Sequence, residues 1–304
     1  MNDLKEDVER DVMQALSDGV DRPGADRRGV DRRDFIKVAL GTGFAAAVMP
    51  VCAQSAIHTD AEGLSVGQFT VKVGGQDVPV YRAQPVGKPH PPVILVVSEI
   101  FGVHEYIADV ARRFAKLGYL ALAPDLFVRQ GDPSKYPSIP ELMQNVVSKV
   151  PDEQVMGDLD AVVAWAQANG GNMDKLGITG FCWGGRIAWL YAAHNPRVRA
   201  GVAWYGHLVG DRTALKPRNP IDIAAQLKTP ILGLYGAQDQ GIPVSTIERM
   251  KEALAQGPSK SEFIVFKDAG HAFHADYRPS YVEADAKLGW EYCIEWFRTH
   301  GVHP

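Results

Sequence analysis

The amino-acid sequence predicts an α/β fold, in which helices cover both faces of a mainly parallel central sheet. Three observations support this prediction. Short apolar runs alternate with amphipathic stretches over roughly 200 residues, and this alternation is typical of β-α-β units. The run at 93–97 is apolar at every position, as expected for a strand that is buried on both faces. The connections are short, which leaves little room for a second domain.

A predicted hairpin precedes the alternating part of the chain. Gly74-Gly75 separates two strand-like runs at 68–73 and 78–81, and paired glycines between such runs favour a tight turn. Further strands are expected at residues 93–97, 119–123, 175–180, 200–205, 231–235 and 262–266.

Helix-periodic stretches separate these strands. The stretch at 106–117 ends at Gly118, a residue that favours helix termination. Residues 128–152 are rich in proline and are expected to be irregular, although 139–149 could hold a helix. The other expected helices lie at 155–169, 186–194, 246–255 and 284–300.

The composition is that of an ordinary globular protein. Hydrophobic residues make up 46% of the 304 positions and charged residues 22%, which excludes a disordered or collagen-like chain. Lys and Arg total 32 against 36 for Asp and Glu, a net charge of -4. Charge therefore gives no reason to expect nucleic acid or an anionic membrane as a partner. The cysteines Cys52, Cys182 and Cys293 are too few for a disulfide scaffold.

The N-terminal region is interpreted as a targeting segment rather than as part of the fold. It is polar and charged, and its Arg32-Arg33 pair is followed by a short apolar run at 38–49. This run is shorter than the stretch of about 20 residues that spans a bilayer. The pair and its flanking residues, Asp31 to Lys37, resemble a twin-arginine export signal. The resemblance implies the twin-arginine export machinery as a partner and a periplasmic or secreted protein.

Signal cleavage is expected after Ala53, because 51–53 offers small residues at the positions that a signal peptidase reads. The chain is then divided into a signal peptide at 1–53, a short lead at 54–64 and a single folded domain at 65–304. The alternative is an ordinary buried helix that follows a disordered tail.

A candidate nucleophile lies in a glycine-rich turn. Cys182 is the third residue of Gly-Phe-Cys-Trp-Gly-Gly at 180–185, between a predicted strand and a predicted helix. This strand-turn-helix context is the one required by a nucleophile elbow. A helix N-terminus favours an anion, so it lowers the pKa of a thiol and can hold an oxyanion. The alternative is a small buried cysteine in a tight turn.

Two further residues complete a candidate catalytic triad. Asp239 follows the predicted strand at 231–235, and His271 follows the one at 262–266. Nucleophile, acid and histidine thus occur in the chain order of an α/β-hydrolase. The histidine would pair with the thiolate and protonate a leaving group, while the aspartate would fix its tautomer. Taken singly, each residue could equally be an ordinary loop residue.

Four segments together resemble the dienelactone hydrolase family, also called carboxymethylenebutenolidases. They are Ser-Glu-Ile-Phe-Gly-Val at 98–103, Ala-Pro-Asp-Leu-Phe-Val-Arg-Gln at 123–130, the cysteine turn at 180–185 and Gly-His-Ala-Phe at 270–273. The resemblance covers about residues 65–300. It implies an α/β-hydrolase fold without a cap domain, a triad of Cys182, Asp239 and His271, and neither a metal nor another cofactor.

The resemblance also assigns residues beside the nucleophile. Glu99 matches the glutamate that helps to generate the thiolate in this family. The backbone N–H groups of Ile100 and Trp183 match the oxyanion hole. Glu99 also follows the apolar run at 93–97 closely, where a carboxylate is costly to bury without a partner. The alternative for Glu99 is a solvent-facing acid on a loop.

The chain departs from the family at the site for the substrate carboxylate. Two arginines bind this group in the family, and Ala275 occupies the position of one of them. The segment that corresponds to the other, 141–150, contains no arginine. Arg278 or Arg129 could replace them from another direction. Nothing in the sequence shows such a replacement, so neutral lactones or esters are expected to be better substrates than a carboxylate-bearing dienelactone.

The expected function is hydrolysis of a small lactone or ester through an acyl intermediate on Cys182, with Tyr205 and Phe273 as candidate pocket residues. The alternatives are a general carboxylesterase or thioesterase on neutral substrates and, from a different class, a non-catalytic ligand-binding protein on the same scaffold. His271, His274 and Asp276 could suggest a metal site, but their spacing on a loop gives no reason to expect one.

Overall fold

The structure of the chain is a computed structural model and describes residues 57–304. The predicted signal peptide at 1–53 and the first residues of the expected lead, 54–56, lie outside the described residues. Between residues 57 and 304, no helix has the length and hydropathy needed to cross a membrane.

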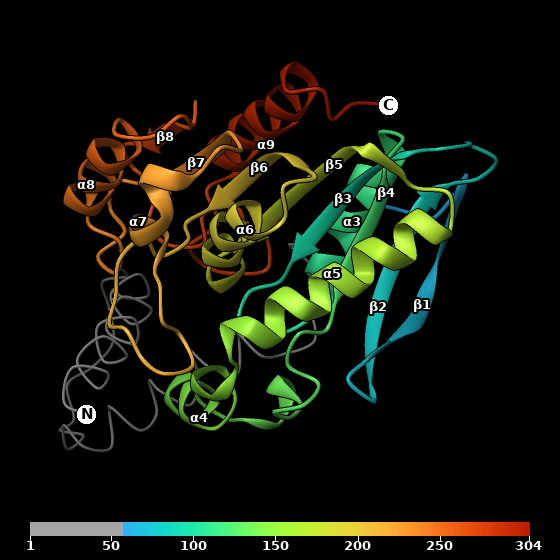
Figure 1. The fold of residues 1–304 in the computed structure, drawn as a ribbon, viewed down its shortest axis with the longest axis horizontal. Coiled ribbons are helices and arrows are strands. Elements are labelled where there is room, and N and C mark those ends of the chain that lie inside the picture. Colours follow the sequence, from blue (N-terminus) through green and yellow to red (C-terminus); the bar gives the residue numbers. More distant parts are fainter. Residues whose placement is uncertain (1–56) are drawn as a thin grey trace, which may run out of the picture.

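An eight-stranded sheet forms the centre of the described part of the chain, with the strand order β1-β2-β4-β3-β5-β6-β7-β8 (Figure 1). The β1-β2 and β2-β4 pairs are antiparallel and all other neighbouring pairs are parallel. The predicted α/β fold with a mainly parallel sheet is therefore confirmed. The strands are β1 (Leu64–Val73), β2 (Gln76–Pro85), β3 (Pro92–Val97), β4 (Leu120–Pro124), β5 (Asn172–Phe181), β6 (Val198–Trp204), β7 (Ile231–Gly236) and β8 (Glu262–Phe266).

Helices cover both faces of the sheet (Figure 1). On one face, α5 and α6 contact each other and both pack against β5. On the other face, Phe114 of α3 packs against Trp290 and Phe297 of α9, with ring centroids 4.7 and 6.1 Å apart. The longer helices are α3 (Glu105–Lys116), α5 (Asp152–Ala168), α6 (Trp183–His194), α8 (Val244–Leu254) and α9 (Glu283–Thr299).

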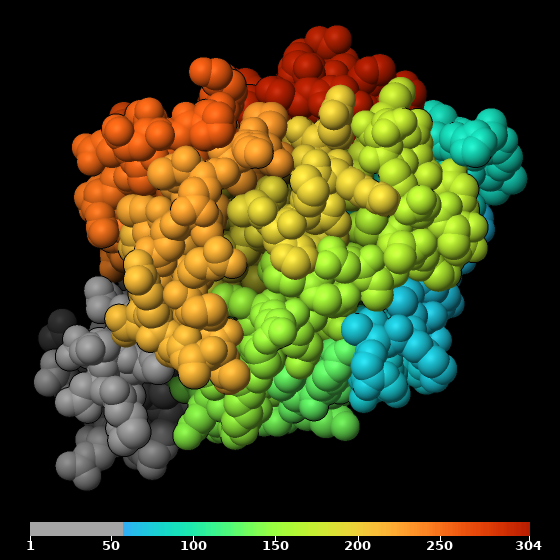
Figure 2. Space-filling view, in the orientation of Figure 1, coloured from blue at the N-terminus to red at the C-terminus, as the bar shows by residue number. Residues whose placement is uncertain are grey.

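The proline-rich region after β4 is more broken than a single helix. It contains η1 (Pro133–Lys135), α4 (Ile139–Asn145) and η2 (Val147–Lys149). The expected helix at 139–149 is interrupted because Val146 leaves the helical conformation, with φ -121° and ψ -69°. The loop after β6 packs against this region (Figure 2). In this contact, Lys216 Nζ donates to the carbonyl of Val147 over 3.1 Å.

Two short helices before β7 were not predicted. They are α7 (Pro220–Ile223) and η3 (Ala224–Gln226). The side chains of Asn219 and Asp222 form a capping box at the start of α7, which stabilises even a single turn. Helices of one turn lack the length over which apolar periodicity becomes visible in a sequence.

The carboxyl ends of the parallel strands lie at one edge of the sheet, as the sheet order requires. Four predicted site residues follow these strand ends: Glu99 after β3, Cys182 after β5, Asp239 after β7 and His271 after β8. Functional residues of parallel sheets are usually found at this edge. No domain-sized insertion separates the strands between residues 57 and 304.

Candidate active site

Cys182 occupies a strained turn between β5 and α6. Its backbone is left-handed, with φ 54° and ψ -115°, and such a conformation costs a non-glycine residue about 1–3 kcal/mol. The flanking glycines make the turn possible. A Cβ on Gly180 would lie 2.1 Å from the carbonyl oxygen of Gly184, and one on Gly184 would lie 2.3 Å from that of Val97. The chain thus has the close packing of a nucleophile elbow.

The close approach of α6 to β3 brings two backbone N–H groups to the same region. Trp183 is the first residue of α6, and Ile100 follows β3. Neither N–H group donates a hydrogen bond to any of residues 57–304. Unpaired N–H groups at a helix N-terminus stabilise negative charge. The two groups are therefore free to act as the oxyanion hole that the family resemblance implies.

A short hydrogen bond links Asp239 to His271. Their Oδ2 and Nδ1 atoms are 2.7 Å apart. The other oxygen of Asp239 accepts the backbone N–H groups of Gly241 and Ile242 over 3.0 and 3.1 Å. The carboxylate is thus fixed by three donors, with only 3% of the residue exposed. This arrangement holds the imidazole ring with Nδ1 toward the acid.

The charges of these groups support one another. Burial alone would raise the pKa of Asp239, but the positive charge and hydrogen bond of His271 hold it below its ordinary value. Burial would lower the pKa of His271, but the charges of Asp239 and of the Cys182 thiolate raise it well above its ordinary value. The site therefore favours the imidazolium form of His271, which can give a proton to the leaving group of an acyl transfer.

Glu99 is buried rather than facing solvent, with 1% of the residue exposed. Its Oε2 accepts a hydrogen bond from the Tyr277 hydroxyl over 2.6 Å and lies 3.4 Å from Nε2 of His104. Burial raises the pKa of Glu99, but His104, Arg278 and Tyr277 outweigh burial and lower it below its ordinary value. The alternative of a solvent-facing loop acid is therefore wrong.

The two aromatic pocket candidates lie around the histidine. Tyr205 packs edge-on against His271, with ring centroids 5.2 Å apart, and Phe273 lies 5.4 Å from Tyr205. Both residues are fully buried. Tyr205 thus packs directly against the His271 ring, and Phe273 packs against Tyr205. The hydroxyl of Tyr205 has no hydrogen-bond partner among residues 57–304.

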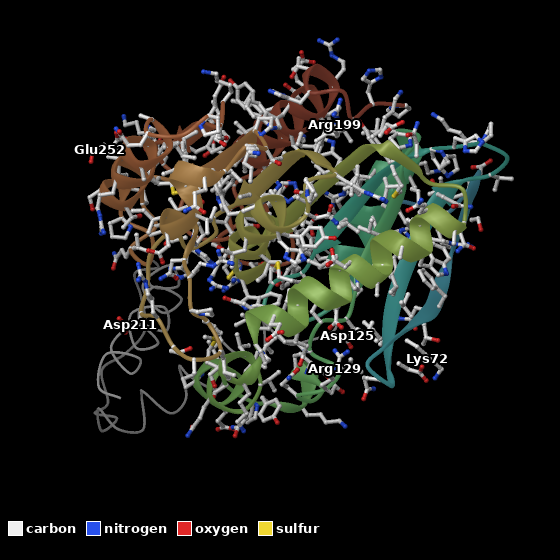
Figure 3. The ribbon with its side chains drawn as sticks, viewed as in Figure 1. Lys72, Asp125, Arg129, Arg199, Asp211 and Glu252 are labelled. Atoms are coloured by element: carbon white, nitrogen blue, oxygen red, sulfur yellow. The ribbon has the colours of Figure 1, made fainter. Side chains whose placement is uncertain are left out.

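The two candidate arginines lie in different environments. Arg129 is engaged with the buried Asp158 of α5, with N–O distances of 2.7 and 2.9 Å, and also donates to Val73 (Figure 3). This ion pair occupies its guanidinium, so Arg129 is engaged by Asp158 rather than available to a ligand. Arg278 lies 5.9 Å from the Phe101 ring centroid. Burial lowers its pKa, but the charges of Tyr277, Glu99 and Cys182 raise it overall.

Arg278 forms no ion pair or hydrogen bond through its guanidinium with any described residue. It is partly buried, and a guanidinium that is partly removed from water and has no hydrogen-bonded partner is a natural site for an anion. The residue is thus available to a ligand, in contrast to Arg129.

Sequence reasoning missed two residues of the site, His104 and Tyr277. Both contact Glu99. Tyr277 is 178 positions away from Glu99 along the chain, and no local pattern connects them.

Two of the residues considered as metal ligands have other partners. His274 is hydrogen-bonded to the Tyr106 hydroxyl over 2.6 Å, and Asp276 accepts a hydrogen bond from Arg113 over 2.6 Å.

Comparisons with known proteins point to one family. Residues 78–301 match the dienelactone hydrolase family. The chain is 59% identical over 271 residues to the "Putative carboxymethylenebutenolidase" of Methylorubrum extorquens, covering 89% of this chain and 93% of the relative. It is 33% identical to the "Probable 2-oxo-3-(5-oxofuran-2-ylidene)propanoate lactonase" of a Bradyrhizobium species, covering 79% and 96%. The crystal structure of the "Putative Dienelactone Hydrolase" of Klebsiella pneumoniae superposes with a TM-score of 0.76 at 51% identity, covering 77% of this chain and 98% of that one.

Proposed function

Because the chain belongs to the dienelactone hydrolase family, whose members are hydrolases of lactone esters, we propose that it opens a small lactone or ester through an acyl intermediate on Cys182. The observation that carries this proposal is the cysteine in the strained turn, together with the His271-Asp239 pair beside it. A protein that only binds a ligand has no chemical need for this arrangement.

The first half of the reaction forms the acyl-enzyme. The Cys182 thiolate attacks the carbonyl carbon, forming a C–S bond, and the carbonyl oxygen becomes an oxyanion held by the N–H groups of Ile100 and Trp183. Each such donor is worth about 3–4 kcal/mol in transition states of this type. The C–O ester bond then breaks as the His271 imidazolium gives its proton to the leaving oxygen. For a lactone, the leaving alcohol is part of the same molecule, so it stays attached to the enzyme through the acyl group on Cys182.

The second half regenerates the enzyme. The neutral His271 takes a proton from a water molecule, and the resulting hydroxide attacks the thioester carbon. The C–S bond breaks, the electron pair returns to Cys182 as a thiolate, and the product leaves as a carboxylic acid. The thiolate is again paired with imidazolium, and Asp239 keeps the ring in the same orientation in both halves.

We infer that the preferred substrate carries a carboxylate. Arg278 supports this inference, because it is a cation near Cys182 with no ion-pair partner among the described residues, and a bidentate guanidinium offsets the desolvation of a carboxylate. The Bradyrhizobium relative is named for a propanoate. Ala275 and the absence of arginine at 141–150 favour the second candidate, a general esterase or thioesterase on neutral substrates.

The N-terminal expectation also stays a proposal: export by the twin-arginine route to the periplasm or the outside of the cell. It is supported by Arg32-Arg33, by the short apolar run at 38–49 and by the small residues at 51–53.

The proposed activity is tested with two matched variants of the purified protein. Cys182→Ala is expected to abolish hydrolysis of a lactone and of an activated phenyl ester. Cys293→Ala removes the other described cysteine, which is buried in α9. This variant should leave kcat unchanged, and the small cavity that it creates should lower only the stability of the protein. Equal activity in both variants would exclude a cysteine nucleophile, and binding without turnover in the native protein would support the ligand-binding alternative.

A further inference from the structure

The turn after β6 has a strained backbone. Tyr205, the residue that follows this strand, adopts a left-handed conformation with φ 37°. For a bulky aromatic residue such a conformation is a genuine outlier, and it persists only where the surrounding structure enforces it. Tyr205 is also fully buried. Residues strained in this way cluster at functional sites, so the position calls for a reason beyond ordinary packing.

Hydrogen bonds tie this turn to the two neighbouring strand ends of the site. On one side, the backbone N–H of Cys182 donates to the carbonyl of Trp204 over 3.0 Å. On the other side, the backbone N–H of Tyr205 donates to the carbonyl of Leu234 in β7 over 2.8 Å. The turn therefore lies between the turn that carries Cys182 and the strand that leads to Asp239.

The turn also has no room to shift. A Cβ on Gly206 would lie 2.4 Å from the backbone nitrogen of Arg186 in α6. The carbonyl of Gly206 accepts a hydrogen bond from the Tyr235 hydroxyl over 2.9 Å. The backbone of Tyr205 is thus fixed from both α6 and β7, and the direction of its side chain is fixed with it.

The side chain so directed packs against the catalytic histidine. The rings of Tyr205 and His271 have centroids 5.2 Å apart and planes inclined at 62°, a geometry that aromatic pairs prefer. Asp239 holds Nδ1 of the same imidazole over 2.7 Å. Cys182 also acts on it, because its charge and hydrogen bonding help to raise the pKa of His271. A carboxylate, a sulfur and an aromatic ring therefore act on the imidazole.

These three interactions do not persist equally through the proposed reaction. In the acyl-enzyme, the sulfur of Cys182 belongs to a neutral thioester and no longer attracts the imidazole. The hydrogen bond from Asp239 fixes Nδ1 but does not prevent a rotation of the ring about that bond. The Tyr205 ring remains in place and opposes such a rotation. Its contribution is therefore larger after acylation than before it.

We propose that Tyr205 is a positioning residue for the second half of the reaction: its ring keeps Nε2 of His271 directed toward the thioester while Cys182 is acylated. This inference rests on the proposed acyl-cysteine mechanism. In the step concerned, Nε2 takes a proton from water, the hydroxide forms the new C–O bond, and the C–S bond breaks with its electron pair returning to sulfur. A misdirected Nε2 slows the step, because proton transfer requires hydrogen-bond reach.

Three variants at this position separate the ring from the rest of the side chain. Tyr205→Leu removes the ring, and the strain of the backbone stays similar because leucine also has a Cβ. Tyr205→Met is a second ring-free variant with an unbranched side chain, for use if the leucine variant does not fold. Tyr205→Phe keeps the ring and removes only the hydroxyl. Phe114→Leu is the matched control, since it removes a fully buried ring that packs against Trp290 of α9.

The measurement is the fraction of enzyme that carries an acyl group on Cys182 during steady-state hydrolysis of a saturating activated phenyl ester. Samples are quenched in acid and analysed by mass spectrometry. The ratio of acylated to free enzyme equals the rate constant of acylation divided by that of deacylation, so a loss common to both steps leaves it unchanged. The ring-free variants are expected to raise this ratio by roughly five- to tenfold, the size that corresponds to one aromatic pair. Unfolded protein would lower the ratio instead.

The control variants define what would overturn the proposal. Tyr205→Phe and Phe114→Leu are expected to keep the native ratio. An unchanged or lowered ratio in the ring-free variants would overturn it, because the ring would then serve both steps equally or serve acylation. A rise in Tyr205→Phe would also overturn it, since the hydroxyl rather than the ring would be responsible.

Failure of the proposed function has a different signature. The native protein and all variants would then hydrolyse the ester without any acyl group on Cys182, and the inference would fall with the mechanism on which it rests. An acyl group on Cys182 in the native protein, with the same ratio in every variant, would instead support the mechanism and overturn only the assignment of Tyr205.

Discussion

Replacement of Arg278 by glutamine tests how the enzyme recognises its substrate. Arg278 has no ion-pair partner among the described residues and lies near Glu99 and Cys182. A hydrogen bond between a guanidinium and a carboxylate contributes about 1.5–3 kcal/mol. Loss of that interaction corresponds to a rise of about 10- to 150-fold in KM for a carboxylate-bearing lactone. KM for the methyl ester of the same lactone should be nearly unchanged.

The assay compares kcat/KM for the free acid and for its methyl ester at pH 8. Removal of the Arg278 charge raises the pKa of Glu99, since this cation is one of the groups that lower it. A changed ionisation of Glu99 affects the acid and the ester alike, so the comparison between the two substrates isolates the effect on binding of the carboxylate. Arg298→Gln is a suitable control, because Arg298 is an exposed residue of α9 paired with Glu295.

Two results would refute this reasoning. Equal losses on the acid and the ester would mean that Arg278 supports the site rather than the substrate carboxylate. A native preference for the ester would instead agree with the sequence-based expectation from Ala275, and the enzyme would then be a general esterase.

Three other variants test the fold, the triad and the signal. Asp239→Asn should lower kcat by about 10⁴-fold or somewhat less in steady-state assays, as in other triads. An unchanged kcat would show that Asp239 is not a member of the triad. Gly184→Ala should unfold or strongly destabilise the protein in thermal melts, because its Cβ would lie 2.3 Å from the Val97 carbonyl oxygen; a native melting temperature would contradict the packing of the turn. Lysine at both Arg32 and Arg33 should retain the precursor in the cytoplasm in fractionation experiments; normal export of this variant would exclude the twin-arginine route.

The parts of the fold that could be predicted are those with local signals. The run at 93–97 is apolar throughout, and it forms the fully buried β3. The end of the helix expected at 139–149 was harder to predict, because it depends on the backbone conformation of Val146. That conformation is set by packing against neighbouring segments, which a linear pattern does not contain.

The same distinction applies to the candidate site. Cys182, Asp239 and His271 each stand next to a recognisable strand end, so their grouping at one sheet edge follows from the parallel topology. The contact between Glu99 and Tyr277 joins positions 178 residues apart, and only the folded chain reveals it.

The arginines were ambiguous for a related reason. Arg129 and Arg278 are both arginines on loops that follow strands of the sheet. They differ in the side chains that they contact in the folded chain. Asp158 on α5 forms an ion pair with Arg129. The sequence does not reveal this contact, because it forms only when α5 packs beside the loop that carries Arg129. The sequence could therefore name two candidates for the carboxylate site without choosing between them.

The most direct test of the central claim is to trap the acyl-enzyme. The native protein is mixed with an activated phenyl ester, quenched in acid within the first turnover and digested for mass spectrometry. The account predicts a mass increase equal to the acyl group on the peptide that contains Cys182, and no adduct in Cys182→Ala. An acyl group on another residue, or unchanged hydrolysis by Cys182→Ala, would contradict it.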